Sequence, residues 1–495
     1  LHAIDIEKGE RCKKTALFTI DAVLILILQN LASILLVSNI IMQGDIMSSV
    51  NYLVVEPTNH ILHSAWIPSS KPETQRAILA ATLANGKSVI YNDLRCLETS
   101  TMKDACRSIG AKIIEEPGRL IIYGTGGKIS PEEKVIDALG SGLVFRVLTA
   151  LTCFSNKPAV ITGDTILRTR VMEPLLDAIN ILGGNVSSIN MNGKAPFVNW
   201  GGYAGGECEI AGNISSQFIT AILFAAPLAQ HSTTLRITGE ILSLSYIRQT
   251  LATLKAAGIH FSHNADLSEI TVFPGEYRPA EYTITGDYTS CSYLVAASTL
   301  FPCDLTLKNI NSHSLQGEQA ILNFVEKMGL QVIRNDEQNE LRLINKTGRL
   351  RGNFAFDVSD CPNIVPTLAA LGSFVDGNFR ITGGSITRLH KSPRIKAMVS
   401  ELSKLGVNIT PLYKNDIYDG FDIQGAANYN GDCSLSSWGD HRIFMSLFVA
   451  SLRCKQANRL DGYEDVHCSF PDFFKEFQQL GVRFEEKIPQ KEEAI

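Results

Sequence analysis

The chain has 495 residues, of which 45% are hydrophobic and 19% are charged, and 50 acidic against 45 basic side chains give a formal net charge of −5. This composition indicates a folded globular protein and excludes a disordered chain, and the length favours two domains. A weakly acidic chain gives no support for nucleic acid as a partner, whereas a small anionic ligand needs only a local cluster of basic residues.

The first 46 residues contain a strongly apolar run, from Ala16 to Met42, which follows Lys13 and Lys14. This arrangement resembles a signal anchor. Polar residues interrupt the run, and no small-residue cleavage site stands out. We therefore favour an over-extended start for residues 1–46, with Met47 as the true first residue, and a membrane tether is the alternative.

Six later stretches share one pattern, in which a short apolar strand and a polar turn precede a long apolar segment. The stretches are residues 66–86, 135–153, 212–229, 282–301, 354–374 and 432–452. Small polar residues directly before an apolar segment of this length are typical of a buried helix with a capped N-terminus.

A second signature alternates with the first, because helical segments end at a glycine that is followed by an alternating apolar strand. The glycines are Gly110, Gly183, Gly258, Gly329, Gly406 and Gly481. Glycine has no Cβ and therefore adopts the left-handed conformation that ends many helices. Its recurrence roughly every 70–80 residues predicts a repeated supersecondary unit. Such units predict an α/β (α+β) fold of two similar halves.

Three arginines, Arg76, Arg146 and Arg442, lie in the first turns of these apolar helices. A helix N-terminus carries unpaired N–H groups and partial positive charge, so several that converge form a site for anions. Capping alone explains the hydroxyl groups in these turns. It does not explain buried arginines, which need an anionic partner, and the pattern therefore favours a bound anion.

Seven motifs together resemble the enolpyruvyl transferase family, and most closely its 5-enolpyruvylshikimate-3-phosphate synthases. The motifs are PSSKPETQRAILAATLANG, TGDTILRTRVMEPLLDAINILGG, GNISSQFITAILFAAPLA, SLSYIRQTL, GDYTSCSYLVAAS, DVSDCPNIVPTLAAL and WGDHRIFMS. The resemblance runs from about residue 50 to residue 485. The related transferases that act on UDP-N-acetylglucosamine are a poorer match, because they have Lys-Asn where this chain has Lys71-Pro72.

The resemblance implies an inside-out α/β barrel of two domains, each with three βαβαββ-type units. Residues 47–68 plus 287–495 would form one domain and residues 69–286 the other, with crossovers near Ser69 and Gly286. The implied reaction is transfer of the carboxyvinyl group of phosphoenolpyruvate to a hydroxyl group, with release of phosphate. Closure of the domains would exclude water from the reactive intermediate.

The family's ligand positions fall on residues of the expected types. For phosphoenolpyruvate they are Lys71, Gly142, Arg170, Gln217, Arg394 and Arg442, and for the acceptor they are Arg76, Ser215, Ser216 and Ser243. Planar arginine side chains bind carboxylate and phosphate groups bidentately, so these types suit a ligand that carries both groups.

The residues that would move protons depart from the family pattern. An aspartate is replaced by Asn363, which we keep as a substrate-binding candidate, and the expected Lys-Glu-Ser/Thr-Asp-Arg run reads His390-Lys391-Ser392-Pro393-Arg394. Three further replacements are Leu143 for a threonine, Ile386 for an asparagine and Cys468 for a lysine. His390 and Lys391, with Lys71, are therefore our candidates for proton transfer.

Three hypotheses stay open. The protein transfers the carboxyvinyl group to a different acceptor, or it is an ordinary shikimate-pathway synthase with unusual residues, or it binds ligand without catalysis. The first predicts turnover only with another hydroxyl-bearing acceptor, the second predicts turnover with shikimate 3-phosphate, and the third predicts binding alone.

The 11 cysteines include no Cys-x-x-Cys pair and indicate core residues of a reducing compartment. The two His-x-x-His pairs, at residues 60–63 and 260–263, lack a supporting third ligand, so we expect no metal. We expect no cofactor, and we expect a cytoplasmic monomer whose partners are small anionic substrates.

Overall fold

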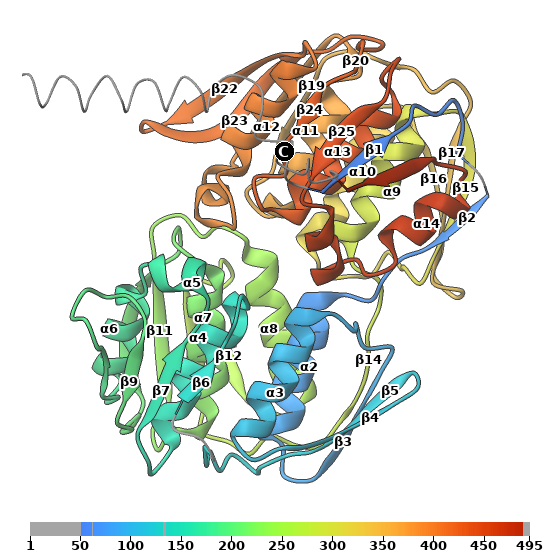
Figure 1. Ribbon diagram of the computed structural model, residues 1–495. Coiled ribbons are helices and arrows are strands. Elements are labelled where there is room, and N and C mark those ends of the chain that lie inside the picture. Colours follow the sequence, from blue (N-terminus) through green and yellow to red (C-terminus); the bar gives the residue numbers. More distant parts are fainter. Residues whose placement is uncertain (1–50, 62, 132–134, 489–495) are drawn as a thin grey trace, which may run out of the picture. The chain divides into compact units, whose positions relative to one another are not determined.

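Six copies of one α/β unit build the chain in the computed structural model, which describes residues 51–488 except 62 and 132–134 (Figure 1). Contacts within the chain group Leu53–Glu485 into one compact unit. The predicted leader, residues 1–46, lies outside the described residues. Within the described ranges, no helix is long and apolar enough to cross a membrane.

Each unit contains a four-stranded sheet with the same strand order. In the sheet β10-β11-β13-β12, for example, β10 is parallel to β11, and β13 is antiparallel to both β11 and β12. The sheets β6-β7-β9-β8 and β19-β21-β23-β22 repeat this arrangement. The repetition confirms the repeated unit that the six glycines predicted.

Three units belong to the blue-to-green part of Figure 1. The first contains β3 (Lys87–Tyr91), β4 (Lys112–Glu116), β5 (Arg119–Tyr123), β14 (Glu281–Thr283), α2 (Lys71–Leu83) and α3 (Leu97–Ser108). The second contains β6 (Val135–Asp137), β7 (Ala159–Thr162), β8 (Val186–Ser188), β9 (Phe197–Asn199), α4 (Gly142–Leu151), η2 (Thr152–Phe154), α5 (Thr165–Thr169) and α6 (Glu173–Ile181). The third contains β10 (Gly206–Ala211), β11 (Thr233–Thr238), β12 (Phe261–His263), β13 (Glu269–Val272), α7 (Ser216–Ala225), η3 (Ala226–Leu228) and α8 (Leu244–Ala256).

The other three units contain the N-terminal strands and the yellow-to-red part of the chain. The fourth contains β2 (Ser64–Trp66), β15 (Cys303–Lys308), β16 (Gln331–Asn335), β17 (Glu340–Asn345), α9 (Tyr288–Leu300), η4 (Gly317–Gln319) and α10 (Ala320–Lys327). The fifth contains β18 (Leu350–Arg351), β19 (Phe354–Asp357), β20 (Val375–Asp376), β21 (Asn378–Thr382), β22 (Asn408–Lys414), β23 (Ile417–Gln424), η5 (Pro362–Ile364), α11 (Val365–Gly372), η6 (Ser385–Leu389) and α12 (Arg394–Lys404). The sixth contains β1 (Tyr52–Val55), β24 (Ser434–Leu435), β25 (Asn458–Asp461), β26 (Phe484–Lys487), α13 (His441–Leu452), η7 (Tyr463–Cys468) and α14 (Phe473–Gln479).

Two short strands are exchanged between units. β2 pairs in parallel with β15 although the chain continues from β2 into α2, and β14 pairs in parallel with β3 although the chain continues into α9. An antiparallel bridge between Ser69 and Gly286 joins the two connections. Gly286 has no room for a side chain, because a Cβ would lie 2.2 Å from the Asn309 carbonyl oxygen. The domain boundaries given above stay a prediction.

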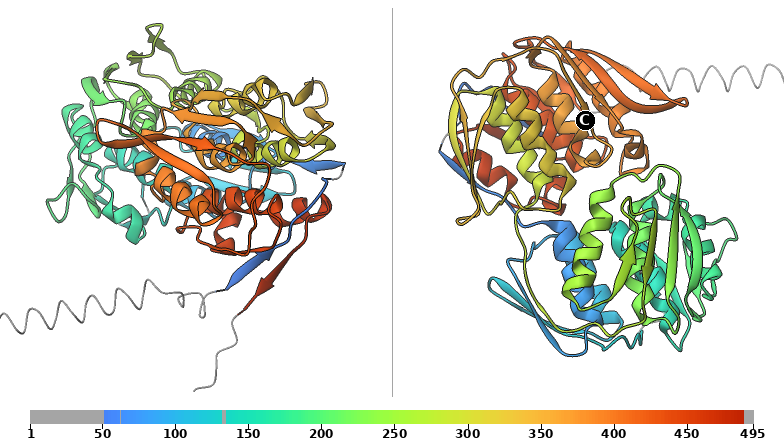
Figure 2. Two further views of the ribbon diagram at one scale, coloured as in Figure 1. Left: turned by 90° about the horizontal axis from the view of Figure 1, so that it is seen from above. Right: turned by 180° about the vertical axis from the view of Figure 1, so that it is seen from behind.

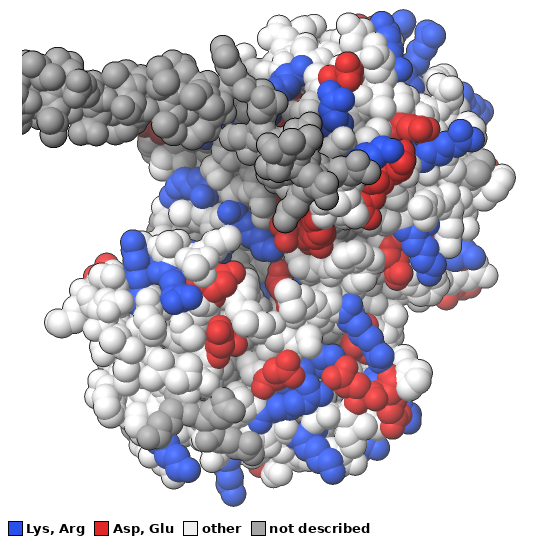
Figure 3. Space-filling view, in the orientation of Figure 1, with Lys and Arg blue, Asp and Glu red and all other residues white. Residues whose placement is uncertain are grey.

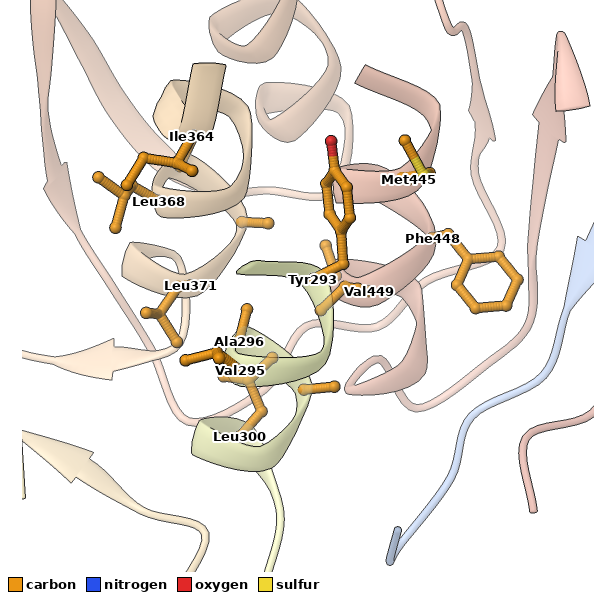
Figure 4. Packing of buried hydrophobic residues seen from close by; sticks show 14 of the residues in the cluster. Tyr293, Val295, Ala296, Leu300, Ile364, Leu368, Leu371, Met445, Phe448 and Val449 are labelled. Atoms are coloured by element: carbon orange, nitrogen blue, oxygen red, sulfur yellow. The ribbon is translucent and has the colours of Figure 1, made fainter. Parts of the chain in front are cut away.

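Two hydrophobic cores are built around buried helices. In the first core, from the N-terminal strands and residues 288–482, every residue of α9, α11 and α13 is buried, and the three helices pack through residues such as Leu300, Leu368 and Phe448 (Figure 4). The second core spans residues 77–284 and contains α2, α4, α7 and α8, of which α2 and α8 lie side by side (Figure 2). Helices inside and sheets outside correspond to the inside-out α/β fold.

The six helix-ending glycines adopt the conformation that the sequence predicts. Each lies two residues beyond the end of α3, α6, α8, α10, α12 or α14, and their φ angles range from 78° to 111°. A side chain at such an angle is strained, which explains why glycine occupies the position in every unit.

Candidate functional site

The first turn of α2 places Lys71 beside a carboxylate. Ser70 caps the helix by accepting a hydrogen bond from the Glu73 N–H, and Pro72 fits the first turn because no N–H is needed there. Lys71 Nζ donates to Glu98 Oε1 at 3.0 Å, and the two side chains are 12% and 17% exposed. Burial lowers the pKa of Lys71, but Glu98, Cys468 and Cys96 together outweigh this effect and the net pKa is raised. Lys71 is therefore held as a cation.

The starts of α4 and α7 meet at Gly142. A Cβ on Gly142 would lie 2.8 Å from Arg146 Nη1, 3.1 Å from Gln217 Oε1 and 3.8 Å from Arg170 Nη1. Arg146 Nη1 also donates to the Gly142 carbonyl oxygen at 2.8 Å. Three of the sequence-derived ligand positions, Gly142, Arg170 and Gln217, are thus brought together.

The start of α12 meets the start of α13 through a buried ion pair. Arg394 Nε lies 2.8 Å from Asp440 Oδ2, and Asp440 Oδ1 accepts a hydrogen bond from the Arg442 N–H at 2.9 Å. Burial raises the pKa of Asp440, yet Arg394 and His441 overcome this and hold it well below its ordinary value. Asp440 thereby positions two of the predicted phosphoenolpyruvate ligands, Arg394 and Arg442.

Two of the four predicted cationic ligands have no carboxylate partner. Arg442 is only 7% exposed and Arg170 is half-buried, and no ion pair of the described residues includes either one. Burial lowers the pKa of Arg170, and the charge of Arg394 lowers it further, against the opposite effect of Asp164. Two buried or half-buried guanidinium groups that form no ion pair among the described residues favour a bound anion.

Lys391 and His390 lie at the same site. Lys391 Nζ contacts Cys468 Sγ at 3.6 Å, and this sulfur lies 3.3 Å from His441 Nδ1. Burial raises the pKa of the Cys468 thiol, although Lys71 and Lys391 oppose the shift. Burial and the charge of Arg394 lower the pKa of His390 well below its ordinary value, so its imidazole is neutral near pH 7.

The predicted acceptor ligands are arranged around α7 and α8. Ser215 Oγ caps α7 by accepting from the Gln217 N–H at 3.3 Å, and Ser216 is the first residue of this helix. Ser243, at the start of α8, has a left-handed φ of 59°, and its N–H donates to the Ser359 carbonyl oxygen.

Arg76 is bound by neutral groups of the protein rather than by a carboxylate. It donates to Thr250 Oγ1 at 3.0 Å, to Thr220 Oγ1 at 3.4 Å and to the carbonyl oxygens of Pro72 and Tyr246. Burial lowers its pKa to about 10. The burial of Arg76 therefore needs no bound anion to explain it.

The sequence did not single out three polar residues that the fold brings to the site. Glu98 pairs with Lys71, while Tyr246 and Glu318 contact Asn363. Tyr246 falls within the motif SLSYIRQTL, which was a usable signal, whereas Glu98 and Glu318 lie outside every motif.

The cationic site is a local feature of the charge distribution. Basic and acidic side chains are intermixed on the face shown in Figure 3. The basic residues of the site come from elements that are far apart in the sequence, namely α2, the end of α5, α12 and α13.

Known proteins resemble this chain over most of its length. The family pattern of EPSP synthase (3-phosphoshikimate 1-carboxyvinyltransferase) matches residues 55–477. A 3-phosphoshikimate 1-carboxyvinyltransferase of Methanosarcina mazei is 36% identical over 427 residues, which cover 86% of this chain and 96% of the relative. The protein of the same name from Methanosphaera stadtmanae is 34% identical over 432 residues, which cover 86% and 98% of the two chains.

Solved structures show the same fold at lower identity. An EPSP synthase from Acinetobacter baumannii has a TM-score of 0.75 at 21% identity and covers 88% of this chain and all of its own. The enolpyruvyl transferase NikO from Streptomyces tendae has a TM-score of 0.71 at 16% identity and covers 89% of this chain and 99% of its own.

Proposed function

The chain belongs to the EPSP synthase (3-phosphoshikimate 1-carboxyvinyltransferase) family of transferases, and we propose that it transfers the carboxyvinyl group of phosphoenolpyruvate to a hydroxyl group of a phosphorylated acceptor. The observation that carries this proposal is the convergence of Lys71, Arg170, Arg394 and Arg442 from separate units. Among the described residues, carboxylates form ion pairs with Lys71 and Arg394 and with neither Arg170 nor Arg442.

In the proposed complex the carboxylate and phosphate groups of phosphoenolpyruvate lie between the guanidinium groups. Arg170 and Arg442 supply charges that form no ion pair within the described part of the chain, and Gln217 adds an amide beside Gly142. The absence of a side chain at Gly142 lets the Arg146 guanidinium and the Gln217 amide lie close to its backbone at the starts of α4 and α7. Ser215, Ser216, Ser243 and Arg76 are the proposed acceptor ligands.

The reaction needs two proton movements at the methylene carbon. The acceptor oxygen bonds to C2 of phosphoenolpyruvate while C3 takes a proton, and C3 then loses a proton as the bond between C2 and the phosphate oxygen breaks. Lys71 and Lys391 are the ammonium groups that can deliver the proton. The buried Nδ1 of His390 has no hydrogen-bond partner among the described residues, so its lone pair is available to a proton, while burial and Arg394 make the imidazole a weak base.

The identity of the acceptor is the more specific part of the proposal. Shikimate 3-phosphate is the first candidate, because the relatives are named 3-phosphoshikimate 1-carboxyvinyltransferases. A different hydroxyl-bearing acceptor is the second candidate, and the observation that favours it is the buried apolar Ile386 together with Asn363, where the resemblance implies an asparagine and an aspartate.

The test is a phosphate-release assay with phosphoenolpyruvate and a panel of acceptors, followed by mass spectrometry of the products. The panel contains shikimate 3-phosphate, unphosphorylated shikimate and phosphorylated sugars, cyclitols and nucleotides. A product that is heavier than its acceptor by one carboxyvinyl group supports transfer and identifies the acceptor. Binding of phosphoenolpyruvate without any adduct contradicts transfer and supports the non-catalytic alternative.

A matched pair of variants connects the assay to the site. Arg442→Gln removes one of the unpaired cations, and we expect roughly a 100-fold loss of phosphoenolpyruvate affinity from the loss of about 3 kcal/mol of charged hydrogen bonding. Arg459→Gln is the control, because its ion pair with Asp432 lies at the surface. Equal affinity in both variants would contradict the placement of phosphoenolpyruvate.

A further inference from the structure

Side chains from the α-helix α8 and from the 3₁₀-helices η4 and η5 form a hydrogen-bonded cluster around Asn363. The Tyr246 hydroxyl, on α8, donates to Glu318 Oε1 at 2.8 Å. Asn363 Nδ2 donates to Tyr246 Oη at 2.6 Å and to Glu318 Oε1 at 2.9 Å. The cluster therefore brings a carboxylate within hydrogen-bond distance of the position where the sequence lacks one.

Glu318 is fixed in this position by the packing around η4. Its residue is 1% exposed, and no ion pair of the described residues includes it. The preceding Gly317 has no room for a side chain, because a Cβ would lie 2.0 Å from the Asp360 carbonyl oxygen and 2.7 Å from Ser245 Oγ. A buried carboxylate without a cationic partner is unfavourable for stability and is typical of functional sites.

Asn363 connects Glu318 to the proposed phosphoenolpyruvate site. Its Oδ1 accepts from Arg394 Nη1 at 2.9 Å, so its Nδ2 must face Tyr246 and Glu318. The amide cannot accept a proton itself, but it holds the carboxylate of Glu318 and the hydroxyl of Tyr246 in place next to the guanidinium of Arg394.

The surroundings of Glu318 favour its protonated form more than water does. Burial raises the pKa of Glu318 and Asp287 raises it further, while hydrogen bonds from the backbone, Tyr246 and Asn363 oppose the shift. The titratable groups that face it are Tyr246 from α8, Asp287 at the start of α9 and Cys361 beside η5. A carboxylate in such surroundings binds a proton more readily than one in water.

We propose that Glu318 takes the role of the missing aspartate and receives, through the Tyr246 hydroxyl, the proton that the acceptor hydroxyl loses. This inference rests on the proposed function. As the acceptor oxygen bonds to C2, its proton passes to Tyr246 Oη while Tyr246 passes its own proton to Glu318, which becomes neutral. The electron pair of the C2–C3 double bond takes a separate proton at C3 from Lys71 or Lys391, and C3 returns a proton to that lysine in the elimination step. The bonding pair of C2 and the phosphate oxygen leaves with the phosphate, which takes the proton from Glu318. In this mechanism the acceptor hydroxyl contacts Tyr246 Oη, and Glu318 is a positioning residue that acts through Tyr246.

The experiment measures kcat, KM for phosphoenolpyruvate and the pH profile in four proteins. These are the wild type, Glu318→Gln, the exchanged double variant Glu318→Gln/Asn363→Asp, and the control Glu476→Gln. Glu476 is also buried and has a raised pKa, but it accepts its hydrogen bond from the Trp66 N–H outside the cluster. The double variant keeps one carboxylate and one amide and returns the carboxylate to position 363.

We expect kcat of Glu318→Gln to fall by roughly 10²–10⁴-fold with KM for phosphoenolpyruvate little changed. The acidic limb of the wild-type pH profile should disappear in this variant, because that limb reports protonation of Glu318. The double variant should recover a large part of kcat, and Glu476→Gln should behave as the wild type does. Full activity in Glu318→Gln, or a loss that Asn363→Asp does not rescue, would overturn the inference.

A second measurement separates this inference from the proposed function. If the wild type turns over no acceptor, the proposed function fails, and infrared difference spectra between acidic and neutral pH then test Glu318 directly. A carboxyl band that titrates above the ordinary range of glutamate, and that Glu318→Gln removes, supports the proton-binding role. A spectrum in which Glu318→Gln removes no such band contradicts it.

Discussion

Arg394 Nε and Asp440 Oδ2 lie 2.8 Å apart, and the two side chains are 4% and 0% exposed. Arg394 begins α12 and Asp440 caps α13, so this ion pair joins the starts of two helices of the first core. Arg394 also donates a hydrogen bond to Asn363, so this ion pair connects the cationic site with the cluster around Glu318.

The substitution Asp440→Asn should lower the free energy of unfolding by about 3–5 kcal/mol, because it leaves the buried Arg394 without its counterion. Urea denaturation measures the change. Asp422→Asn is the control, since its pair with Arg380 is exposed and should contribute only about 0–1 kcal/mol. Equal losses of unfolding free energy in the two variants would show that the buried ion pair contributes no more to stability than the exposed one.

The stabilisation from Asp440 should depend on pH in one direction. The folded pKa of Asp440 is far below the unfolded value of about 3.9, so its contribution is fully present above that value and is lost as the pH falls towards the folded pKa. The difference in unfolding free energy between the wild type and Asp440→Asn should therefore be constant from about pH 6 to pH 8 and narrow below about pH 4. A difference that widens on acidification would contradict the assigned pKa shift.

Gly142→Ala should weaken the binding of phosphoenolpyruvate by roughly tenfold, or about 1.4 kcal/mol. The added Cβ would meet Arg146 Nη1 at 2.8 Å and Gln217 Oε1 at 3.1 Å, so these side chains must move. Isothermal titration calorimetry measures the affinity. The control is Gly275→Ala, where the nearest atom, Ile259 Cδ1, lies at 3.7 Å, and an equal loss there would point to a general effect of the alanine.

Lys391→Ala should reduce kcat by roughly 10²–10⁴-fold while phosphoenolpyruvate still binds, because the proposed role of Lys391 is proton transfer. Steady-state kinetics and equilibrium binding together measure the two effects. Lys396→Ala, an exposed lysine in α12, is the control. Unchanged turnover in Lys391→Ala would remove this residue from the mechanism.

Local rules made much of the fold predictable. The positive φ of Gly110, Gly183 and the four equivalent glycines follows from the lack of a Cβ, which is a property of the residue alone. The apolar segments became helices because their length and their capping residues favour helix, as with Ser215 at the start of α7. The spacing of these signals was sufficient to predict six units.

The cations of the site were predictable because three of them lie in family motifs and the fourth in a run that aligns with one. Lys71, Arg170 and Arg442 lie in the motifs, Arg394 ends the run that begins at His390, and the structure brings the four together, although their role in binding stays a prediction. The burial of Arg76 was interpreted as a sign of a bound anion, but neutral hydroxyl and carbonyl groups from α2, α7 and α8 accept its hydrogen bonds. No pattern in the sequence reveals such partners, since they come from three different helices.

The sequence by itself determined the repeated unit, the helix ends and the family, because capping, glycine conformation and hydrophobic periodicity act over a few neighbouring residues. Only the tertiary structure decided which carboxylates face the cations. Glu98 reaches Lys71 across 27 positions and Glu318 reaches Asn363 across 45. Hydrogen bonds and charge interactions act over a few ångströms of space, and the packing of the helices sets those distances.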